Sequence, residues 1–315
     1  MPVLPVDKPL GLSSHDVVAR ARRLLGTRRV GHAGTLDPLA SGVLVLLTEE
    51  ATKLSPFLTA SDKEYLAWVA FGLGTPTLDA EQPEDAATLT WAEPGATAAL
   101  TRESVAVAAR TFLDVTEQRP PAFSAIKQGG TRSYAAARRG ETTEPPARPV
   151  AYRHVEVLAF APLRGGLPAN AGPDGRPFRL PPELAELPCA LVSLTVAAGT
   201  YVRSFARDLG AALGVPAHLA GLVRTRAGKV RLTDCSALEG VAGAAPLDPV
   251  ALLPYPRIDL DAAAAVAVRQ GKQVTLGLTS TTALVDEDGA LAAVVEPGAG
   301  GRLRYLRVWQ RGLTP

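Results

Sequence analysis

The sequence predicts a mixed α/β protein with two domains, and three observations support this prediction. Segments whose apolar residues recur at helical spacing alternate with short apolar or alternating segments that are typical of strands. The chain has 315 residues, which corresponds to about two domains at roughly 150 residues each. Beyond residue 256, short alternating segments separated by turns predict a small β-barrel of about 60 residues.

Helices are expected in four places. Residues 13–25 carry apolar residues at helical spacing behind a candidate N-cap, which is Ser13 or Ser14. A short helix is expected over 49–58, another over 101–113, and a fourth after residue 204.

Strands are expected where apolar runs or strict alternation replace that spacing. The run 43–47 predicts a buried strand, 65–75 a strand ended by glycines, and 192–196 a strand that alternates apolar and hydroxyl side chains. We expect the last strand to continue extended through 199–204, so that residues 201 and 203 share one face.

The connecting segments are marked by Gly and Pro. Residues 26–42 predict a loop, 120–141 an ordered but mobile loop and helix, and 164–182 a surface loop. Residues 246–258 are typical of a domain junction.

Composition excludes several protein classes. With 47% hydrophobic and 20% charged residues, the chain falls in the globular range. It has no apolar run near the ~18 residues of a membrane span and no apolar core in its first residues, MPVLPVDKPLG, so we expect a soluble, cytoplasmic protein. Cys189 and Cys235 form neither a disulfide framework nor a metal-ligand pattern.

The distribution of charge is more informative than the total of +2, which by itself argues against a polyanionic partner. Of the 33 basic residues 27 are Arg, an excess that a GC-rich genome also explains. The arginines gather, however, in three clusters, at 20–29, 224–231 (with Lys229) and 302–311. Such segregation can create a basic face on a nearly neutral molecule; three unrelated solvated faces remain the alternative.

The string GHAGTLDPLASGVLVL (31–46) contains the first candidate for chemistry. Asp37 lies between a Gly-rich loop and an apolar strand, where a carboxylate could act as nucleophile, base or ligand. From spacing alone an Asp-Pro turn is favoured, and His32 is more often a surface residue. The Gly-rich segment 72–77 lacks the ending of a phosphate loop, there is no G-x-S-x-G elbow, and the four histidines are too scattered for zinc.

Five segments, of which one contains Asp37, carry a family resemblance: DKPLGLSSHDVV (7–18), GHAGTLDPLASGVL (31–44), KEY (63–65), PPAFSAIKQGGTRSY (120–134) and GTYVRSFARDLG (199–210). In this order they resemble the bacterial tRNA pseudouridine-55 synthase (TruB) family. The resemblance implies a pseudouridine synthase catalytic domain over 1–250, with a largely antiparallel sheet and an RNA-gripping insertion at about 120–147. It implies a PUA-like RNA-binding β-barrel over 256–315.

The resemblance also implies the activity. Members of the family convert a uridine in the tRNA T loop to pseudouridine, with no metal or organic cofactor. We therefore expect a monomer that acts on the T stem-loop of tRNA, has no membrane partner and flips the target base out of its stack.

Site residues follow by position in the motifs. The resemblance implies that Asp37 is the catalytic aspartate, that Tyr65 packs on the base and handles the C5 proton, and that Arg203 pairs with the catalytic carboxylate. The further residues it implies line the pocket, aid T-loop insertion or support the site; they are Tyr201, Leu222, His32, Lys8 and Asp79. An adjacent guanidinium would keep a buried carboxylate ionised by lowering its pKa.

The chain departs from the family pattern in four places. Ala33 replaces a common Thr, the segment 75–82 loses a final Gly but keeps Asp79, Phe123 replaces a frequent Tyr, and 164–182 resembles an insertion. Two alternatives stay open: a non-catalytic RNA-binding or tRNA-folding factor, and a pseudouridine synthase with another RNA target.

Overall fold

The computed structural model describes residues 2–80, 88–123, 127–128, 131–132, 145–162 and 187–314. The chain forms two compact units, which we describe separately. The first, called unit 1, contains residues 1–37, 43–61 and 227–315; unit 2 contains 38–42 and 62–226. The predicted domains 1–250 and 256–315 stay a prediction.

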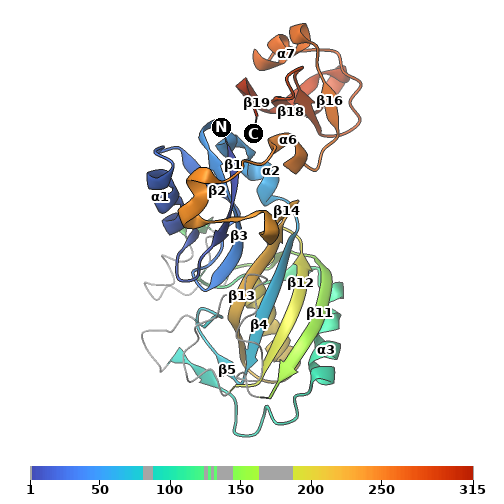
Figure 1. Ribbon diagram of the computed structural model, residues 1–315. Coiled ribbons are helices and arrows are strands. Elements are labelled where there is room, and N and C mark those ends of the chain that lie inside the picture. Colours follow the sequence, from blue (N-terminus) through green and yellow to red (C-terminus); the bar gives the residue numbers. More distant parts are fainter. Residues whose placement is uncertain are drawn as a thin grey trace. The chain divides into compact units, whose positions relative to one another are not determined.

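The described residues contain one large sheet of nine strands (Figure 1). Its order is β11-β12-β4-β13-β3-β1-β15, with β14 beside β13 and β2 beside β3. The strands are β1 (Val3–Lys8), β2 (Val30–Ala33), β3 (Ala40–Thr48), β4 (Lys63–Phe71), β11 (Tyr152–Ala161), β12 (Cys189–Val196), β13 (Ala217–Ala227), β14 (Val230–Arg231) and β15 (Ser236–Ala237). β4, β12 and β11 pair antiparallel, as do β2 and β3, whereas β13–β3 and β1–β15 are parallel.

This arrangement confirms the predicted mixed α/β class with largely antiparallel sheets. The strands predicted at 43–47, 65–75 and 192–196 lie within β3, β4 and β12, although β4 ends at Phe71 and the chain turns at Gly72. The predicted loop 26–42 is wrong on both sides of Asp37, because strands form there. Before Asp37, β2 pairs with the second half of β3, and after it the first residues of β3 pair with β13.

Unit 2 places helices α3 (Arg102–Arg110) and α5 (Val202–Ala212) against the sheet. α3 begins with a capping box between Thr101 and Ser104, continues as η3 (Thr111–Asp114) and packs against β11 (Figure 1). Short two-stranded pairs complete the described part of this unit: β5 (Leu73–Gly74) with β6 (Thr90–Trp91), β7 (Glu117–Gln118) with β10 (Arg148–Pro149), and β8 (Lys127–Gln128) with β9 (Thr131–Arg132).

One glycine allows the close approach of β3 and β13. Gly42 has φ +101°, and a Cβ there would lie 2.3 Å from the backbone oxygen of Arg224. Only glycine fits this position, because both its backbone conformation and its neighbour exclude a side chain. Gly42 therefore helps to set the register in which the first residues of β3, just beyond Asp37, pair with β13.

In unit 1, β1 is followed by α1 (Ser14–Leu24), whose N-cap is Ser13. η1 (Glu49–Leu54) and α2 (Ser55–Thr59) form where a short helix is predicted, and η6 (Leu232–Asp234) and η7 (Leu238–Gly243) follow β13 and its neighbours. The apolar face of α1 packs on β1, β3 and η7 through Val17, Val18 and Ala21.

The C-terminal segment forms its own sheet in the order β16-β17-β18-β19. Its elements are α6 (Pro249–Leu252), β16 (Arg257–Asp259), α7 (Ala262–Arg269), β17 (Thr282–Val285), β18 (Leu291–Pro297), η8 (Ala299–Gly301) and β19 (Leu303–Leu313). The predicted strands are present, but the alternation gave no sign of α7, which the N-cap Asp261 begins. Closure of this sheet into a barrel stays a prediction.

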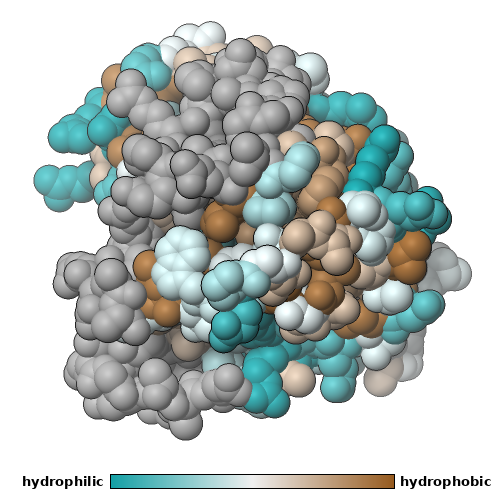
Figure 2. All heavy atoms as spheres, turned by 90° about the horizontal axis from the view of Figure 1, so that it is seen from below, coloured by the Kyte–Doolittle hydropathy of each residue, from teal (hydrophilic) through white to brown (hydrophobic). Residues whose placement is uncertain are grey.

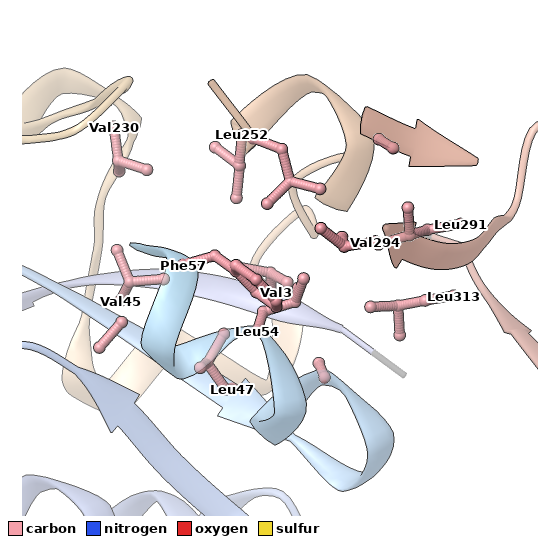
Figure 3. Close-up of a cluster of buried hydrophobic side chains, with 14 of the residues drawn as sticks. Val3, Val45, Leu47, Leu54, Phe57, Val230, Leu252, Leu291, Val294 and Leu313 are labelled. Carbon is pink, nitrogen blue, oxygen red and sulfur yellow. The ribbon is translucent and has the colours of Figure 1, made fainter. Parts of the chain in front are cut away.

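A shared apolar core ties this segment to the first residues of unit 1 (Figure 3). Val3, Leu47 and Phe57 lie in one buried cluster with Leu291 and Leu313. The indole Nε1 of Trp309 also donates to the backbone oxygen of Glu50 at 2.9 Å. The predicted junction 246–258 is therefore part of a packed core, in which Leu252 and Leu253 are buried.

The exposed surface is mixed in polarity. Among the described residues the most exposed large apolar side chains are Val107 (60%) and Trp91 (56%). Figure 2 shows apolar side chains lying among polar ones on the face that it views from below. Across the described ranges, no helix is long and apolar enough to span a membrane. Most of the predicted elements at 120–141 and 164–182 lie outside the described residues.

Candidate active site

Asp37 lies in the short loop between β2 and β3, half-buried and directly after the buried Leu36. The backbone before it is held by one side chain. Ser14 Oγ donates to the Leu36 carbonyl at 3.0 Å and accepts from the Leu36 N–H at 2.8 Å. The side chain of Ser14 is fully buried, so both backbone groups of Leu36 are satisfied in a place that water does not reach.

The start of α1 explains why Ser14 can do this. Ser13 is the N-cap, and it exchanges hydrogen bonds with Asp16 in a capping box. Ser14 is thereby the first helical residue, and its hydroxyl is available for Leu36. Of the two cap candidates, Ser13 has the capping role and Ser14 holds the loop.

Arg203 lies in the first turn of α5 and is buried. Its Nη1 donates to the Thr77 carbonyl at 2.8 Å and its Nη2 to the Phe123 carbonyl at 3.0 Å. Nη1 also lies 3.7 Å from Oδ2 of Asp79. The guanidinium is therefore held in place by two backbone carbonyls and one carboxylate.

Asp79 is 2% exposed and bound on several sides. Its Oδ1 accepts from the Thr77 hydroxyl at 2.6 Å, and the Thr75 hydroxyl donates to its backbone oxygen at 2.7 Å. The residue also forms a parallel bridge with Leu219 in β13. The structure thus joins two predicted site residues, Asp79 and Arg203, in a buried ion pair of unit 2.

The predicted extended conformation of residues 201–203 is wrong. Tyr201 is extended, with φ −100° and ψ 116°, but the helix begins at Val202. The expectation that Tyr201 and Arg203 share a strand face therefore fails, because alternation of side chains holds only in a strand. The spacing of three residues between Val202 and Phe205, which is typical of a helix, was the signal for an earlier helix start.

Tyr65 and Leu222 lie on the neighbouring strands β4 and β13. Tyr65 is 9% exposed and stands opposite Leu194 in β12, and Leu222 is 5% exposed and pairs with Ala40 in β3. Ala40 is three residues beyond Asp37 in the chain. Both predicted pocket residues thus lie in the central part of the large sheet.

Lys8 and His32 lie in unit 1. Lys8, at the end of β1, is fully buried, and its Nζ donates to the carbonyls of Pro9 and Leu12, in keeping with a supporting role. His32 lies in β2, where its ring meets that of His15 edge-on at a centroid distance of 5.7 Å.

Comparison with known proteins identifies the family. The model of the N-terminal domain of the TruB family pseudouridylate synthases matches residues 22–167. The tRNA pseudouridine synthase B of Deinococcus deserti is 46% identical over 318 residues, which cover 98% of this chain and 100% of that protein. The protein of the same name from Thermus thermophilus is also 46% identical, with 99% of each chain covered. The chain belongs to the TruB family of pseudouridylate synthases.

Solved structures agree with this assignment at the level of the fold. The archaeal box H/ACA sRNP Nop10–Cbf5 complex matches with a TM-score of 0.62 and 20% identity, covering 98% of this chain and 85% of that chain. An H/ACA RNP bound to a substrate RNA containing 2'-deoxyuridine matches with a TM-score of 0.64 and 22% identity, covering 100% and 87%. By family the chain is thus a pseudouridine synthase, an isomerase, and its fold is similar to that of these two structures.

Two of the three basic clusters of this TruB-family enzyme are exposed. The arginines at 20–29 and at 302–311 lie on the surface of unit 1, and Arg29 forms ion pairs with Glu49 and Glu50. The cluster at 224–231 is different. Arg224 is 1% exposed, and Arg226 pairs with Glu64 at 2.5 Å, so these two side chains belong to the strands rather than to a basic surface.

Burial also lowers the pKa of a lysine in the KEY segment of this synthase. Lys63, at the start of β4, is 6% exposed. Burial, and then the nearby charge of Arg224, lowers its pKa to about 8, because both disfavour the ammonium form. Two cations thus lie close to each other inside unit 2, near Tyr65.

Two residues that hold the backbone beside predicted site residues were not predicted from the sequence. Ser14 was expected only as a possible helix cap, and Gln118 was not singled out at all. Gln118 is 4% exposed and bonds the backbone of Tyr201. The available signal was the amide side chain of Gln118 just before the apolar-rich segment PPAFSA (120–125). An amide that is buried in such a place is normally hydrogen-bonded and can therefore hold another part of the chain.

Proposed function

We propose that this chain isomerises uridine 55 in the T loop of tRNA to pseudouridine, with Asp37 as the essential carboxylate. The observation that carries the proposal is the presence of Asp37, Tyr65 and Arg203, in the motifs of the family resemblance, in a chain 46% identical, over 98% of its length, to a protein named tRNA pseudouridine synthase B. A non-catalytic RNA-binding protein would have no need of all three.

The reaction exchanges one glycosidic bond for another. The bond between N1 of uracil and C1′ of the ribose breaks, the base turns, and a bond between C5 and C1′ forms. C5 then loses its proton and N1 gains one, so no oxidant or reductant is needed. Asp37 could attack the base, attack C1′, or remove a proton to form a glycal, and each route needs an ionised carboxylate at the junction of base and ribose.

The remaining side chains have supporting roles in this proposal. Arg203, held by backbone carbonyls and Asp79, would supply the positive charge that pairs with the catalytic carboxylate, as the family resemblance implies. Tyr65 packs on the flipped base and handles its C5 proton, while Leu222 and Tyr201 line the same pocket. Flipping costs a few kcal/mol of lost stacking, which contacts with aromatic and apolar groups offset.

We further propose that unit 1 contributes to the binding of tRNA. Its two exposed arginine clusters, at 20–29 and 302–311, would contact tRNA phosphates, and residues 256–315 would act as a PUA-like domain. Backbone contacts of this kind release counterions, so they make binding depend on salt. His32 would assist insertion at the T loop, and the enzyme would act as a monomer in the cytoplasm, without metal or organic cofactor.

The test is incubation of the protein, without added metal, with an unmodified T stem-loop transcript, followed by mapping of pseudouridine. The proposal predicts product at the position equivalent to 55. No product would refute the enzymatic proposal, and product at a different uridine would refute the site. Neutralising the arginines at 302–311 should weaken binding and flatten its salt dependence, and an unchanged slope would contradict the phosphate contacts.

A further inference from the structure

Gln118 connects two segments of unit 2 that are far apart in sequence. It is the last residue of β7, and both ends of its amide bond the backbone of Tyr201, 83 residues away. Oε1 accepts from the Tyr201 N–H at 2.8 Å, and Nε2 donates to the Tyr201 carbonyl at 3.1 Å and to the Tyr152 hydroxyl at 2.8 Å.

The orientation of this amide is determined by its partners. A backbone N–H can only donate and a carbonyl can only accept, so Oε1 must face the N–H of Tyr201 and Nε2 its carbonyl. Tyr152 is held in turn by edge-on contacts with Phe112 and a tilted contact with Phe205. Burial raises the pKa of its hydroxyl, so the group stays neutral and can accept the bond from Gln118.

The start of α5 needs such support from outside. Tyr201 is the N-cap, and its own side chain makes no cap bond; tyrosine is not among the residues that cap well. The Tyr201 carbonyl already accepts from the Phe205 N–H at 3.1 Å as the first helical bond. Gln118 therefore holds the peptide groups at which the chain changes from extended to helical.

The residues that follow Gln118 strengthen the same connection. The Arg119 carbonyl accepts from Ser204 Oγ at 2.9 Å and from Arg207 Nη2 at 3.0 Å, and the Phe123 carbonyl accepts from Arg203 Nη2. Within the first two turns, α5 thus bonds to three residues of the 118–123 segment. A shift of Gln118 would move Tyr201 directly and Arg203 through the backbone two residues on.

We infer that Gln118 is a positioning residue for the isomerisation, acting through Tyr201 and Arg203. This inference rests on the proposed function for its kinetic consequence and on the hydrogen bonds above for its structural one. Groups that must meet a reacting ribose and base lose rate when displaced by about an ångström, even where substrate binding survives.

The main test is Gln118→Met, which keeps the volume of the side chain and removes all three hydrogen bonds. With the T stem-loop transcript, we expect kcat to fall about 10- to 100-fold while KM changes less than about 3-fold. Gln118→Glu keeps the acceptor for the Tyr201 N–H, so its kcat should be at least about 3-fold higher than that of Gln118→Met.

The chain contains a matched control. Gln273 makes the same pair of bonds with another residue, Leu303: Oε1 accepts from its N–H at 2.7 Å and Nε2 donates to its carbonyl at 3.1 Å. This pair lies in the C-terminal segment and bonds no predicted catalytic residue. Because residues 256–315 are proposed to bind RNA, Gln273→Met can raise KM, but it should leave kcat within about 3-fold of the unmodified protein.

The outcomes separate clearly. Unchanged kcat in Gln118→Met, a loss confined to KM, an equal loss in Gln273→Met, or no recovery in Gln118→Glu would each overturn the inference. If Gln118→Met does not fold, Gln118→Glu decides: a kcat below that of the unmodified protein supports the inference, and an equal kcat overturns it.

A second readout does not depend on activity. Hydrogen exchange at the amides of residues 201–204 should accelerate at least about 10-fold in Gln118→Met, or in Gln118→Glu if only that variant folds, and remain unchanged in Gln273→Met. Unchanged exchange would overturn the inference. If the unmodified protein makes no pseudouridine, the proposed function fails, whereas the exchange result still decides whether Gln118 orders this segment.

Discussion

The segments that carry Asp37 and Arg203 are held by the same kind of hydrogen-bonded side chain but differ in burial and in local structure. In each, one buried polar side chain bonds both backbone groups of a nearby residue: Ser14 holds Leu36, one residue before Asp37, and Gln118 holds Tyr201, two residues before Arg203. Asp37 is half-buried in a loop, whereas Arg203 is buried in the first turn of a helix, where its side chain bonds two carbonyls and lies beside Asp79.

This difference suits the roles that we propose. A guanidinium keeps its charge throughout the reaction, so nothing is lost when its geometry is fixed in advance. The carboxylate must form a bond with the substrate or move a proton, so a held backbone together with a half-buried position in a loop is the more useful arrangement. Four variants test this comparison, from the largest expected effect to the smallest.

The largest effect is expected at Asp37. Asp37→Asn keeps the size of the side chain and removes its charge and basicity, so single-turnover pseudouridine formation should fall by at least about 10³-fold. Binding of the T stem-loop, measured by filter retention, should change little. Turnover within about 10-fold of the unmodified protein would remove Asp37 from the catalytic role.

The next largest effect is expected when Arg203 loses its carboxylate neighbour. Asp79→Leu leaves a buried guanidinium without that charge, which should cost about 3–5 kcal/mol in the free energy of unfolding. Urea unfolding measures this change. The exposed pair of Arg304 and Glu296 provides the control, because Glu296→Gln should cost at most about 1 kcal/mol. Equal costs would show that Arg203 does not depend on Asp79.

A smaller effect is expected at the aspartate loop. Ser14→Ala leaves both backbone groups of Leu36 buried without the hydroxyl, at a cost of about 1–3 kcal/mol, and should lower turnover as well. Ser13→Ala is the matched control on the same helix. It removes the N-cap at a cost of about 1 kcal/mol but leaves Leu36 bonded. If both variants lose equal turnover, the hydroxyl of Ser14 does not position Asp37.

The smallest effect is expected in the pH dependence of stability that Lys63 causes, in the same unit as Arg203. The pKa of Lys63 is about 8 in the fold and near its ordinary value of 10.5 in the unfolded chain. Between these values the unfolded chain binds more protons, so this residue makes stability rise with pH. The stability advantage expected for Lys63→Met at pH 7 should therefore shrink as pH increases from 8 to 10.5. A constant difference across that window would contradict the lowered pKa.

Much of the fold could be predicted from local pattern. The helices at 13–25 and 101–113 and the strands at 43–47 and 192–196 formed where periodicity placed them, because each buries one face or a whole run of apolar residues. Prediction failed at β2 and at Val202, where short segments take their conformation from tertiary contacts, and at α7, whose Asp261 cap and alanine-rich sequence are a local signal that the search for alternation missed.

The sequence by itself determined the mixed α/β class and, through motifs in register, the family and the identity of Asp37, Tyr65 and Arg203 as candidates. Only the tertiary structure decided which polar groups meet: Ser14 with Leu36 across 22 residues, Gln118 with Tyr201 across 83, and Asp79 with Arg203. It also decided that Arg224 is buried while the other two basic clusters are exposed. The physical reason is that periodicity records which residues are buried, whereas a hydrogen-bond partner depends on which distant strands and helices pack together.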